Sequence, residues 1–411
     1  MIEILILLSI AVTSIVSDDC ASWQRPFEVD TSLFPFDSHC ISLTHGRIHY
    51  IDLQPQNTEP LGTVLAFHGN PVWNIIFAKV ASKALANGYR FLALDYYGYG
   101  MSDKPDLNVF DYRIRSQASM AAEFMRELNL TNLLIIVQDG GGPIGLGAAQ
   151  EEASRIKGFI IANTWFTRTE PIQNGTTNEN FIFHDWSMDN IVNERYFVAT
   201  GYNSFAGARG TVSAWQLNPN STEGTSLTRM MLSPYFENGN ASKPLSDTVH
   251  VPHVRLVQSV LQEQDYYSNL EENMAMIVLK PVYFLFADPL AFSALRCDAG
   301  PRTRIDLNSS DAIKYDAKQL TGIRAACPTS FTCTDNPPKP FQSYCLDSQG
   351  KQYWHELEDF LRVWPSSKIA GIYKDFPGHE YLSARAPDQF IVAIQTLHNF
   401  TPTNTARKIQ Q

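Results

Sequence analysis

The 411-residue sequence predicts an α/β protein with a mostly parallel sheet, helices on both faces of the sheet, and an inserted second domain. Short β-branched and aromatic runs alternate with helical stretches between residues 47 and 166, and the pattern returns after residue 281. The strand-like runs are almost continuously apolar, as expected for strands buried on both faces. Residues 170–275 between them are aromatic, polar and rich in turn residues, which indicates the insertion.

The order of the expected elements gives the domain limits. The expected strands cover residues 47–53, 63–69, 89–98, 133–139, 158–166, 281–288 and 368–376. Apolar residues at helical spacing predict helices at 111–130, 353–364 and 387–400. We therefore expect a signal peptide at 1–17, a first core segment at 41–168, a cap domain at 169–275, and a second core segment at 276–411 with a cysteine-rich insert at 295–350.

The composition limits the classes of partner. The formal net charge is −10, and no block of Lys and Arg occurs, which argues against nucleic acid or an anionic membrane surface. We expect a small, neutral, apolar ligand, with a protein as the alternative. The spacing of His250 and His253 is too generic to indicate a metal site.

Three features indicate secretion. An apolar run from Ile4 to Val16 is followed by small and acidic residues, as in a signal peptide, and is too short to span a bilayer comfortably. Glu3 replaces the usual basic residue, so an uncleaved signal anchor is the alternative. N-glycans are expected on the sequons at Asn129, Asn174, Asn220, Asn240, Asn308 and Asn399.

The third feature is the even number of cysteines, which predicts disulfides in an oxidising compartment. The preferred pairing joins Cys20 to Cys40. It places two local bridges among the other four cysteines, which are Cys297, Cys327, Cys333 and Cys345. Zinc is the weaker alternative, because no CxxC spacing occurs.

Polar residues at the ends of expected strands are the candidates for chemistry, since ligands of parallel sheets bind at the carboxyl ends of the strands. The four ends carry His68-Gly69-Asn70-Pro71, Asp139, Asp288 and, shortly after the last strand, His379. We interpret His68 as a buried, hydrogen-bonded residue that supports its loop.

Asp139 is followed by Gly140 and Gly141, as expected for a nucleophile held in a sharp strand-to-helix turn. The backbone N–H groups of Gly140 and Asn70 would form an oxyanion hole. A nucleophile followed by an acid and then a histidine is the order of the α/β-hydrolase fold. A carboxylate nucleophile attacks tetrahedral carbon and forms an alkyl ester, which a histidine-activated water then hydrolyses. The structural alternatives are a helix cap for Asp139, a core histidine for His379 and a turn residue for Asp288.

The segments "FHGNPVW", "LDYYGYGMSDKP", "VQDGGGPIG" and "GHEYLSARAPDQF" together resemble the haloalkane dehalogenases, including their animal and luciferase-like relatives. The resemblance covers roughly residues 41–166 and 281–400. It implies that Asp139 is the nucleophile, His379 the base and Asn70 a halide-stabilising side chain. It also implies that the acid follows one of two strands, and because Asn163 ends the first of these, the acid is Asp288. No cofactor or metal is expected.

One position departs from the family. Its members carry a tryptophan directly after the nucleophile, whose indole N–H holds the halide, whereas this chain has Gly140. Trp165, Trp186 or Trp215 is a candidate replacement as the substrate-binding donor. The alternatives to dehalogenation are a cofactor-independent luciferase of the coelenterazine type, a catalytically inactive binding protein, and epoxide hydrolysis assisted by a cap tyrosine from the set Tyr196, Tyr202, Tyr235, Tyr266 and Tyr267.

Overall fold

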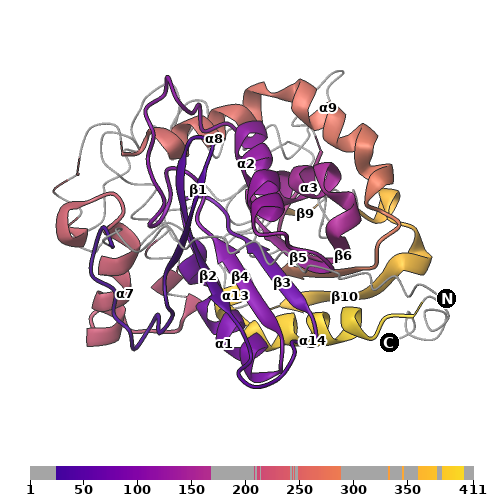
Figure 1. Ribbon diagram of the computed structural model, residues 1–411, viewed down its shortest axis with the longest axis horizontal. Coiled ribbons are helices and arrows are strands. Elements are labelled where there is room, and N and C mark those ends of the chain that lie inside the picture. Colours follow the sequence, from indigo (N-terminus) through magenta and orange to yellow (C-terminus); the bar gives the residue numbers. More distant parts are fainter. Residues whose placement is uncertain are drawn as a thin grey trace, which may run out of the picture.

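The computed structural model describes residues 25–167, 208, 211–212, 214–240, 243, 245, 249–287, 332–333, 345–346, 360–376 and 382–401. Their central feature is an eight-stranded sheet with the order β1-β2-β4-β3-β5-β6-β7-β10 (Figure 1). The strands are β1 (His39–Leu43), β2 (Gly46–Leu53), β3 (Thr63–Phe67), β4 (Arg90–Leu94), β5 (Leu133–Gln138), β6 (Ile156–Ala162), β7 (Val282–Ala287) and β10 (Ile369–Phe376).

The predicted mostly parallel sheet is confirmed. Strand β2 pairs antiparallel with β1 and β4, and every other neighbouring pair is parallel. Every expected strand overlaps an observed one, and β1 is an additional strand that the sequence pattern did not indicate.

Helices cover both faces of the sheet, as predicted. They are α1 (Ala78–Ala86), α2 (Ile114–Glu127), α3 (Gly141–Glu151), α7 (Thr222–Leu232), α8 (Val251–Gln262), α9 (Gln264–Glu272), α13 (Leu382–Arg385) and α14 (Pro387–His398). Short 3₁₀ turns occur at Asn74–Phe77, Ala153–Arg155, Glu237–Gly239, Asn273–Met276 and Ser366–Lys368. Residues 360–363 are helical, and the rest of the helix expected at 353–364 lies outside the described residues.

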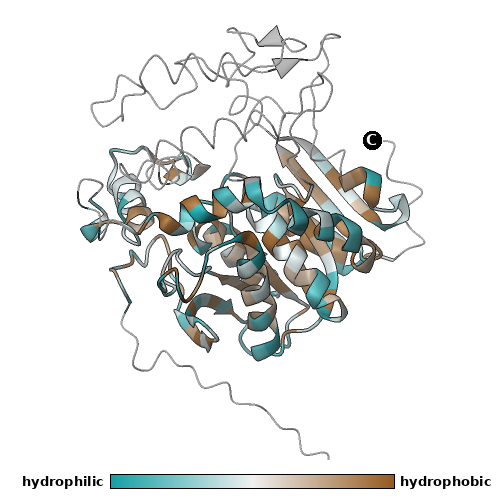
Figure 2. Ribbon diagram, turned by 90° about the horizontal axis from the view of Figure 1, so that it is seen from above, coloured by the Kyte–Doolittle hydropathy of each residue, from teal (hydrophilic) through white to brown (hydrophobic). Residues whose placement is uncertain are grey.

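The two faces of the sheet bury different helices because successive strand side chains point in opposite directions. In β3, Leu65 and Phe67 pack in one apolar cluster with α2, α3, α8 and α9, whereas Val64 and Ala66 pack in a second cluster with α1, α7 and α14. Figure 1 shows α2 and α3 on one side of the sheet and α1 and α14 on the other. In Figure 2 the strands are largely brown, and the helices over them carry teal polar residues.

Helices α8 and α9, within the predicted cap range, lie directly against the core. The backbone N–H of Ile114 donates to Ser259 Oγ at 2.9 Å, and the Tyr266 hydroxyl donates to the Pro143 carbonyl at 2.7 Å. The cap is therefore joined to α2 and to the first turns of α3. The domain limits stay predictions.

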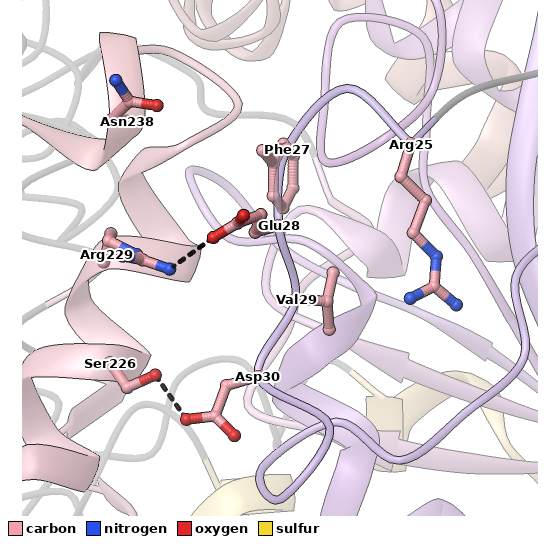
Figure 3. Close-up of a pocket in the computed structure, with 8 residues that line it drawn as sticks. All are labelled: Arg25, Phe27, Glu28, Val29, Asp30, Ser226, Arg229 and Asn238. Atoms are coloured by element: carbon pink, nitrogen blue, oxygen red, sulfur yellow. Dashed lines mark hydrogen bonds and ion pairs between the residues drawn. The ribbon is translucent and has the colours of Figure 1, made fainter.

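An N-terminal segment, residues 25–37, connects the core to α7 (Figure 3). Ser226 Oγ donates to Asp30 Oδ2 at 2.5 Å, and Arg229 pairs with Glu28 at 3.3 Å. The Phe27 ring meets the core residue Trp73 edge-on with centroids 5.9 Å apart. The open surface pocket drawn in Figure 3 lies between this segment and α7 and contains none of the predicted catalytic residues.

The described part of the insert is a two-stranded antiparallel pair, β8 (Thr332–Cys333) and β9 (Cys345–Leu346). Cys333 lies opposite Cys345 in its register, and Cys40 is buried in β1. Cys20, Cys297 and Cys327 lie outside the described residues, as does the expected signal peptide. Among the residues that the structure describes, no helix combines the length and apolar character needed to cross a bilayer.

Candidate active site

Asp139 lies between β5 and α3, in the turn that the sequence predicted. Its φ is 54°, in the left-handed region that residues other than glycine rarely adopt. Three hydrogen bonds of its backbone hold this conformation. Its N–H donates to the Asn163 carbonyl at 3.0 Å, and its own carbonyl accepts from the N–H of Gly142 at 2.9 Å and from the hydroxyl of Thr164. The turn therefore presents the Asp139 side chain at the carboxyl edge of the sheet.

Close packing explains two of the three glycines after Asp139. A Cβ on Gly141 would lie 2.3 Å from the Phe67 carbonyl oxygen, and one on Gly142 would lie 1.8 Å from Thr164 Oγ1. Gly140 differs, because its Cβ would meet only Leu256 Cδ2 at 3.6 Å and the Asn70 nitrogen at 3.8 Å, which are ordinary contacts. The β3 backbone therefore requires glycine at 141 and the Thr164 side chain requires it at 142, whereas position 140 has room for a side chain.

The loop after β3 brings Asn70 to the Asp139 carboxylate. The backbone N–H of Asn70 donates to Asp139 Oδ1 at 2.9 Å, and the backbone N–H of Gly140 also hydrogen-bonds the carboxylate. These are the two backbone donors that we predicted from the sequence to form an oxyanion hole. Gly69 makes the approach possible, since a Cβ there would lie 2.4 Å from Asp139 Cβ.

Burial raises the pKa of Asp139 to about 6, and the two backbone hydrogen bonds offset part of that rise. The group is therefore a carboxylate above about pH 6, with less solvation than an exposed aspartate. A poorly solvated carboxylate is a stronger nucleophile, and a raised pKa in a polar turn is typical of functional sites.

His68 supports the same loop in the structural role that we expected. Its Nδ1 lies 2.8 Å from the Gly69 carbonyl, and its Nε2 lies 3.4 Å from the backbone nitrogen of Tyr96. Burial lowers the pKa of His68 to about 4, so the ring is neutral at pH 7. A neutral imidazole that donates through Nδ1 and accepts through Nε2 satisfies both contacts.

The Asn70 side chain contacts a residue that no sequence pattern indicated as part of the site. The hydroxyl of Tyr99 donates to Asn70 Oδ1 at 2.9 Å. Tyr99 belongs to the "LDYYGYGMSDKP" segment, which was noted for the resemblance alone. Only the fold brings this tyrosine to the amide.

Trp165, a predicted substrate-binding donor, is partly buried after β6. Its indole N–H donates to the hydroxyl of Tyr267 in α9 at 3.2 Å. Tyr267 is fully buried, and burial together with the charges of Glu263 and Asp139 raises the pKa of its hydroxyl. The indole N–H of Trp165 is thus bonded to a tyrosine of the predicted cap range, and the role of Trp165 toward a substrate stays a prediction.

The predicted acid and base, Asp288 and His379, lie outside the described residues, as does Trp186. Strand β7 ends at Ala287, the residue before Asp288. Its parallel neighbour β10 ends shortly before His379. Asn163 is buried at the end of β6, where its carbonyl accepts from the Asp139 N–H. The roles of Asp288 and His379 therefore stay predictions.

Within the described residues, no group of three or more His, Cys, Asp or Glu side chains is arranged to hold a metal ion. His250 and His253 are both buried, with ring centroids 6.0 Å apart.

Residues 62–201, which include Asn70, Asp139 and Trp165, match the family model of the α/β hydrolase fold. The chain is 39% identical to haloalkane dehalogenase 2 of Mycobacterium tuberculosis (strain ATCC 25618 / H37Rv) over 140 residues, 34% of this chain and 46% of that protein. It is 32% identical to the haloalkane dehalogenase of Mycobacterium marinum over 158 residues, 37% of this chain and 50% of that protein.

The chain spans about half the length of the curated relatives it matches. Among solved structures, the tetrameric haloalkane dehalogenase DpaA from Paraglaciecola agarilytica NO2 matches with a TM-score of 0.55 and 16% identity, over 90% of this chain and 94% of that one. This chain has the α/β-hydrolase fold and resembles the haloalkane dehalogenases.

Proposed function

We propose that the protein hydrolyses carbon–halogen bonds through an alkyl ester on Asp139. The observation that carries the proposal is the Asp139 carboxylate, which sits in the turn after β5. Its Oδ1 is held by the backbone N–H of Asn70, and the backbone N–H of Gly140 is a second donor to the carboxylate. The names of the bacterial relatives give the same reaction class.

The reaction has two steps. Asp139 Oδ2 attacks the carbon that carries the halogen, a C–O bond forms, and the halide leaves with the bonding electrons. His379, oriented by Asp288, then removes a proton from a water that attacks the carboxyl carbon of the ester. The oxyanion that forms on Oδ1 is stabilised by the two backbone N–H groups, and its collapse releases the alcohol and restores the carboxylate. The net reaction consumes one water and yields alcohol, halide and a proton.

Stabilisation of the leaving halide distinguishes this chain from its relatives. Asn70 is the predicted donor, and Gly140 provides no side-chain donor at the position where the family has an indole. We therefore expect bromide and iodide to be released much faster than chloride, because the better leaving groups need less stabilisation.

One observation favours an epoxide as a second candidate substrate. The Tyr267 hydroxyl accepts a hydrogen bond from Trp165, which makes it a better donor, and burial together with the charges of Glu263 and Asp139 raises its pKa, so it stays protonated. A neutral tyrosine has the chemistry to protonate the oxygen of an epoxide that a carboxylate opens.

The test is halide release and diol formation from a panel of bromoalkanes, chloroalkanes and epoxides. We expect turnover that is lost in Asp139→Ala and kept in Asp37→Ala, which removes an exposed carboxylate. His379→Gln should accumulate the ester, visible as a mass increase on the peptide that contains Asp139. An adduct on another peptide would refute the assignment. No turnover on any substrate would favour the luciferase, detected as light with coelenterazine, or the inactive binding protein.

We further propose that the protein is secreted, glycosylated and disulfide-bonded. Supporting this, Asn129, Asn220, Asn240 and Asn399 are exposed, and Cys333 lies opposite Cys345. Expression in animal cells should place the protein in the medium, and glycosidase treatment should lower its mass. Retention in the membrane fraction would instead support the uncleaved signal anchor.

A further inference from the structure

Tyr99 connects a buried aromatic cluster to the predicted leaving-group donor. Its hydroxyl donates to Asn70 Oδ1 at 2.9 Å, while the backbone N–H of Asn70 donates to Asp139 Oδ1 at 2.9 Å. An amide that accepts through its oxygen has Nδ2 as its remaining donor group. We propose that Tyr99 is a positioning residue that fixes the Asn70 amide with Nδ2–H directed at the departing group. This inference rests on the proposed function.

The surroundings of Tyr99 suit this task. The side chain is fully buried, and its ring stacks on His253 with centroids 4.9 Å apart and an interplanar angle of 14°. Tyr96 meets the ring edge-on at 5.9 Å, and His68 packs against it at 5.4 Å. A ring with three aromatic neighbours has little rotational freedom, so the hydroxyl stays on Asn70.

The protonation state of Tyr99 also suits a permanent donor. Burial raises the pKa of the hydroxyl well above its ordinary value, with smaller contributions from Tyr235, Tyr96 and Asp139. The same burial lowers the pKa of His253, so the stacked ring is neutral at pH 7. The Tyr99–Asn70 hydrogen bond therefore persists over the whole working range of the carboxylate.

A purely structural tyrosine in the same segment provides the matched control. Tyr97 is also fully buried, but its hydroxyl donates to the carbonyl of Gly46, the first residue of β2, at 2.9 Å. Tyr99→Phe and Tyr97→Phe each delete one buried hydroxyl and keep the ring. Only Tyr99→Phe removes a hydrogen bond to Asn70.

The kinetic experiment compares the full-length variants on a bromoalkane and the matching chloroalkane. In Tyr99→Phe we expect kcat to fall about tenfold with little change in KM, because an amide free to rotate presents its donor less often. The fall should be larger for chloride, the poorer leaving group, and Tyr97→Phe should stay within about twofold of wild type. In an Asn70→Ala background, Tyr99→Phe should cause no further loss, since coupled residues are not additive. Equal losses in both tyrosine variants, or full additivity with Asn70→Ala, would overturn the proposal.

Bromide binding, measured by titration calorimetry, separates this inference from the proposed function. If wild type releases no halide but Tyr99→Phe alone binds bromide more weakly, the role of Tyr99 stands and the proposed hydrolysis fails. A wild-type protein that binds no bromide would refute Nδ2 of Asn70 as a halide donor, and the positioning role with it.

Discussion

Replacing Asp139 by asparagine is expected to abolish turnover and to stabilise the protein. The pKa of Asp139 rises from 3.8 to about 6 on folding, because the carboxylate loses solvation in the turn after β5. A rise means that the folded state binds the proton more tightly than the unfolded state. The ionised group therefore destabilises the fold above about pH 6, and this penalty disappears as the pH falls below 3.8.

The size of the expected stabilisation follows from the rise in the pKa of Asp139. Two pKa units correspond to roughly 3 kcal/mol of folding free energy at pH 8. Asparagine removes the charge and keeps an oxygen that accepts from the N–H groups of Asn70 and Gly140. For a chain of this length, a gain of that size raises Tm by about 4 °C.

The assay is thermal unfolding of wild type, Asp139→Asn and Asp37→Asn at pH 8 and pH 4.5. We expect the Asp139→Asn advantage to shrink by about two thirds between the two pH values, and the exposed Asp37 control to show no such advantage. An Asp139→Asn protein that is less stable than wild type at pH 8, or equally stabilised at both pH values, would refute the account of a desolvated carboxylate.

The remaining predictions concern pH and packing. Turnover should fall about tenfold per pH unit below about 6, measured as kcat/KM, because Asp139 then binds a proton; a flat profile down to pH 5 would contradict this. Gly141→Ala should lower the free energy of unfolding, measured in urea, by about 1–3 kcal/mol, whereas Gly140→Ala should unfold like wild type. An equal loss of unfolding free energy in both variants would refute the packing account. His68 and His250 have pKa values lowered to about 4 by burial, so the unfolded state binds more protons. The stability that these neutral histidines contribute to the fold above pH 6.5 should be lost as the pH falls toward 4. Wild-type protein with the same urea midpoint at pH 7 and pH 5 would count against buried neutral histidines.

The sequence predicted the sheet well because parallel strands are buried on both faces. The run in β5 is fully buried along its length, and such a run has few alternatives to a central strand. Strand β1 was not indicated, because its five residues include the half-buried His39 and the exposed Ser42 and carry only a weak pattern.

Glycines in α3 resemble turn residues, yet Gly145 packs against Phe67 and Gly147 against Tyr266. Tertiary contact outweighed local propensity there.

In the candidate site too, residues with a local sequence signal could be predicted, and residues defined by tertiary contacts could not. Asp139, Asn70 and Gly140 could be selected from sequence, since strand ends and glycine spacing are local signals. Tyr99 could not be selected, and Tyr267 could not be separated from the other four candidate tyrosines of the cap. The contacts of these two residues with Asn70 and Trp165 join segments that are distant in the chain. A buried tyrosine in sequence resembles any core aromatic, and only the positions of neighbouring elements show what its hydroxyl contacts.

The most direct test of the central claim is a single turnover of a bromoalkane in H₂¹⁸O with enzyme in excess. Attack by Asp139 predicts that the first alcohol carries the ordinary oxygen of the carboxylate and that ¹⁸O appears in the peptide containing Asp139. Direct attack by water would place ¹⁸O in the first alcohol and leave that peptide unlabelled, which would contradict the ester mechanism.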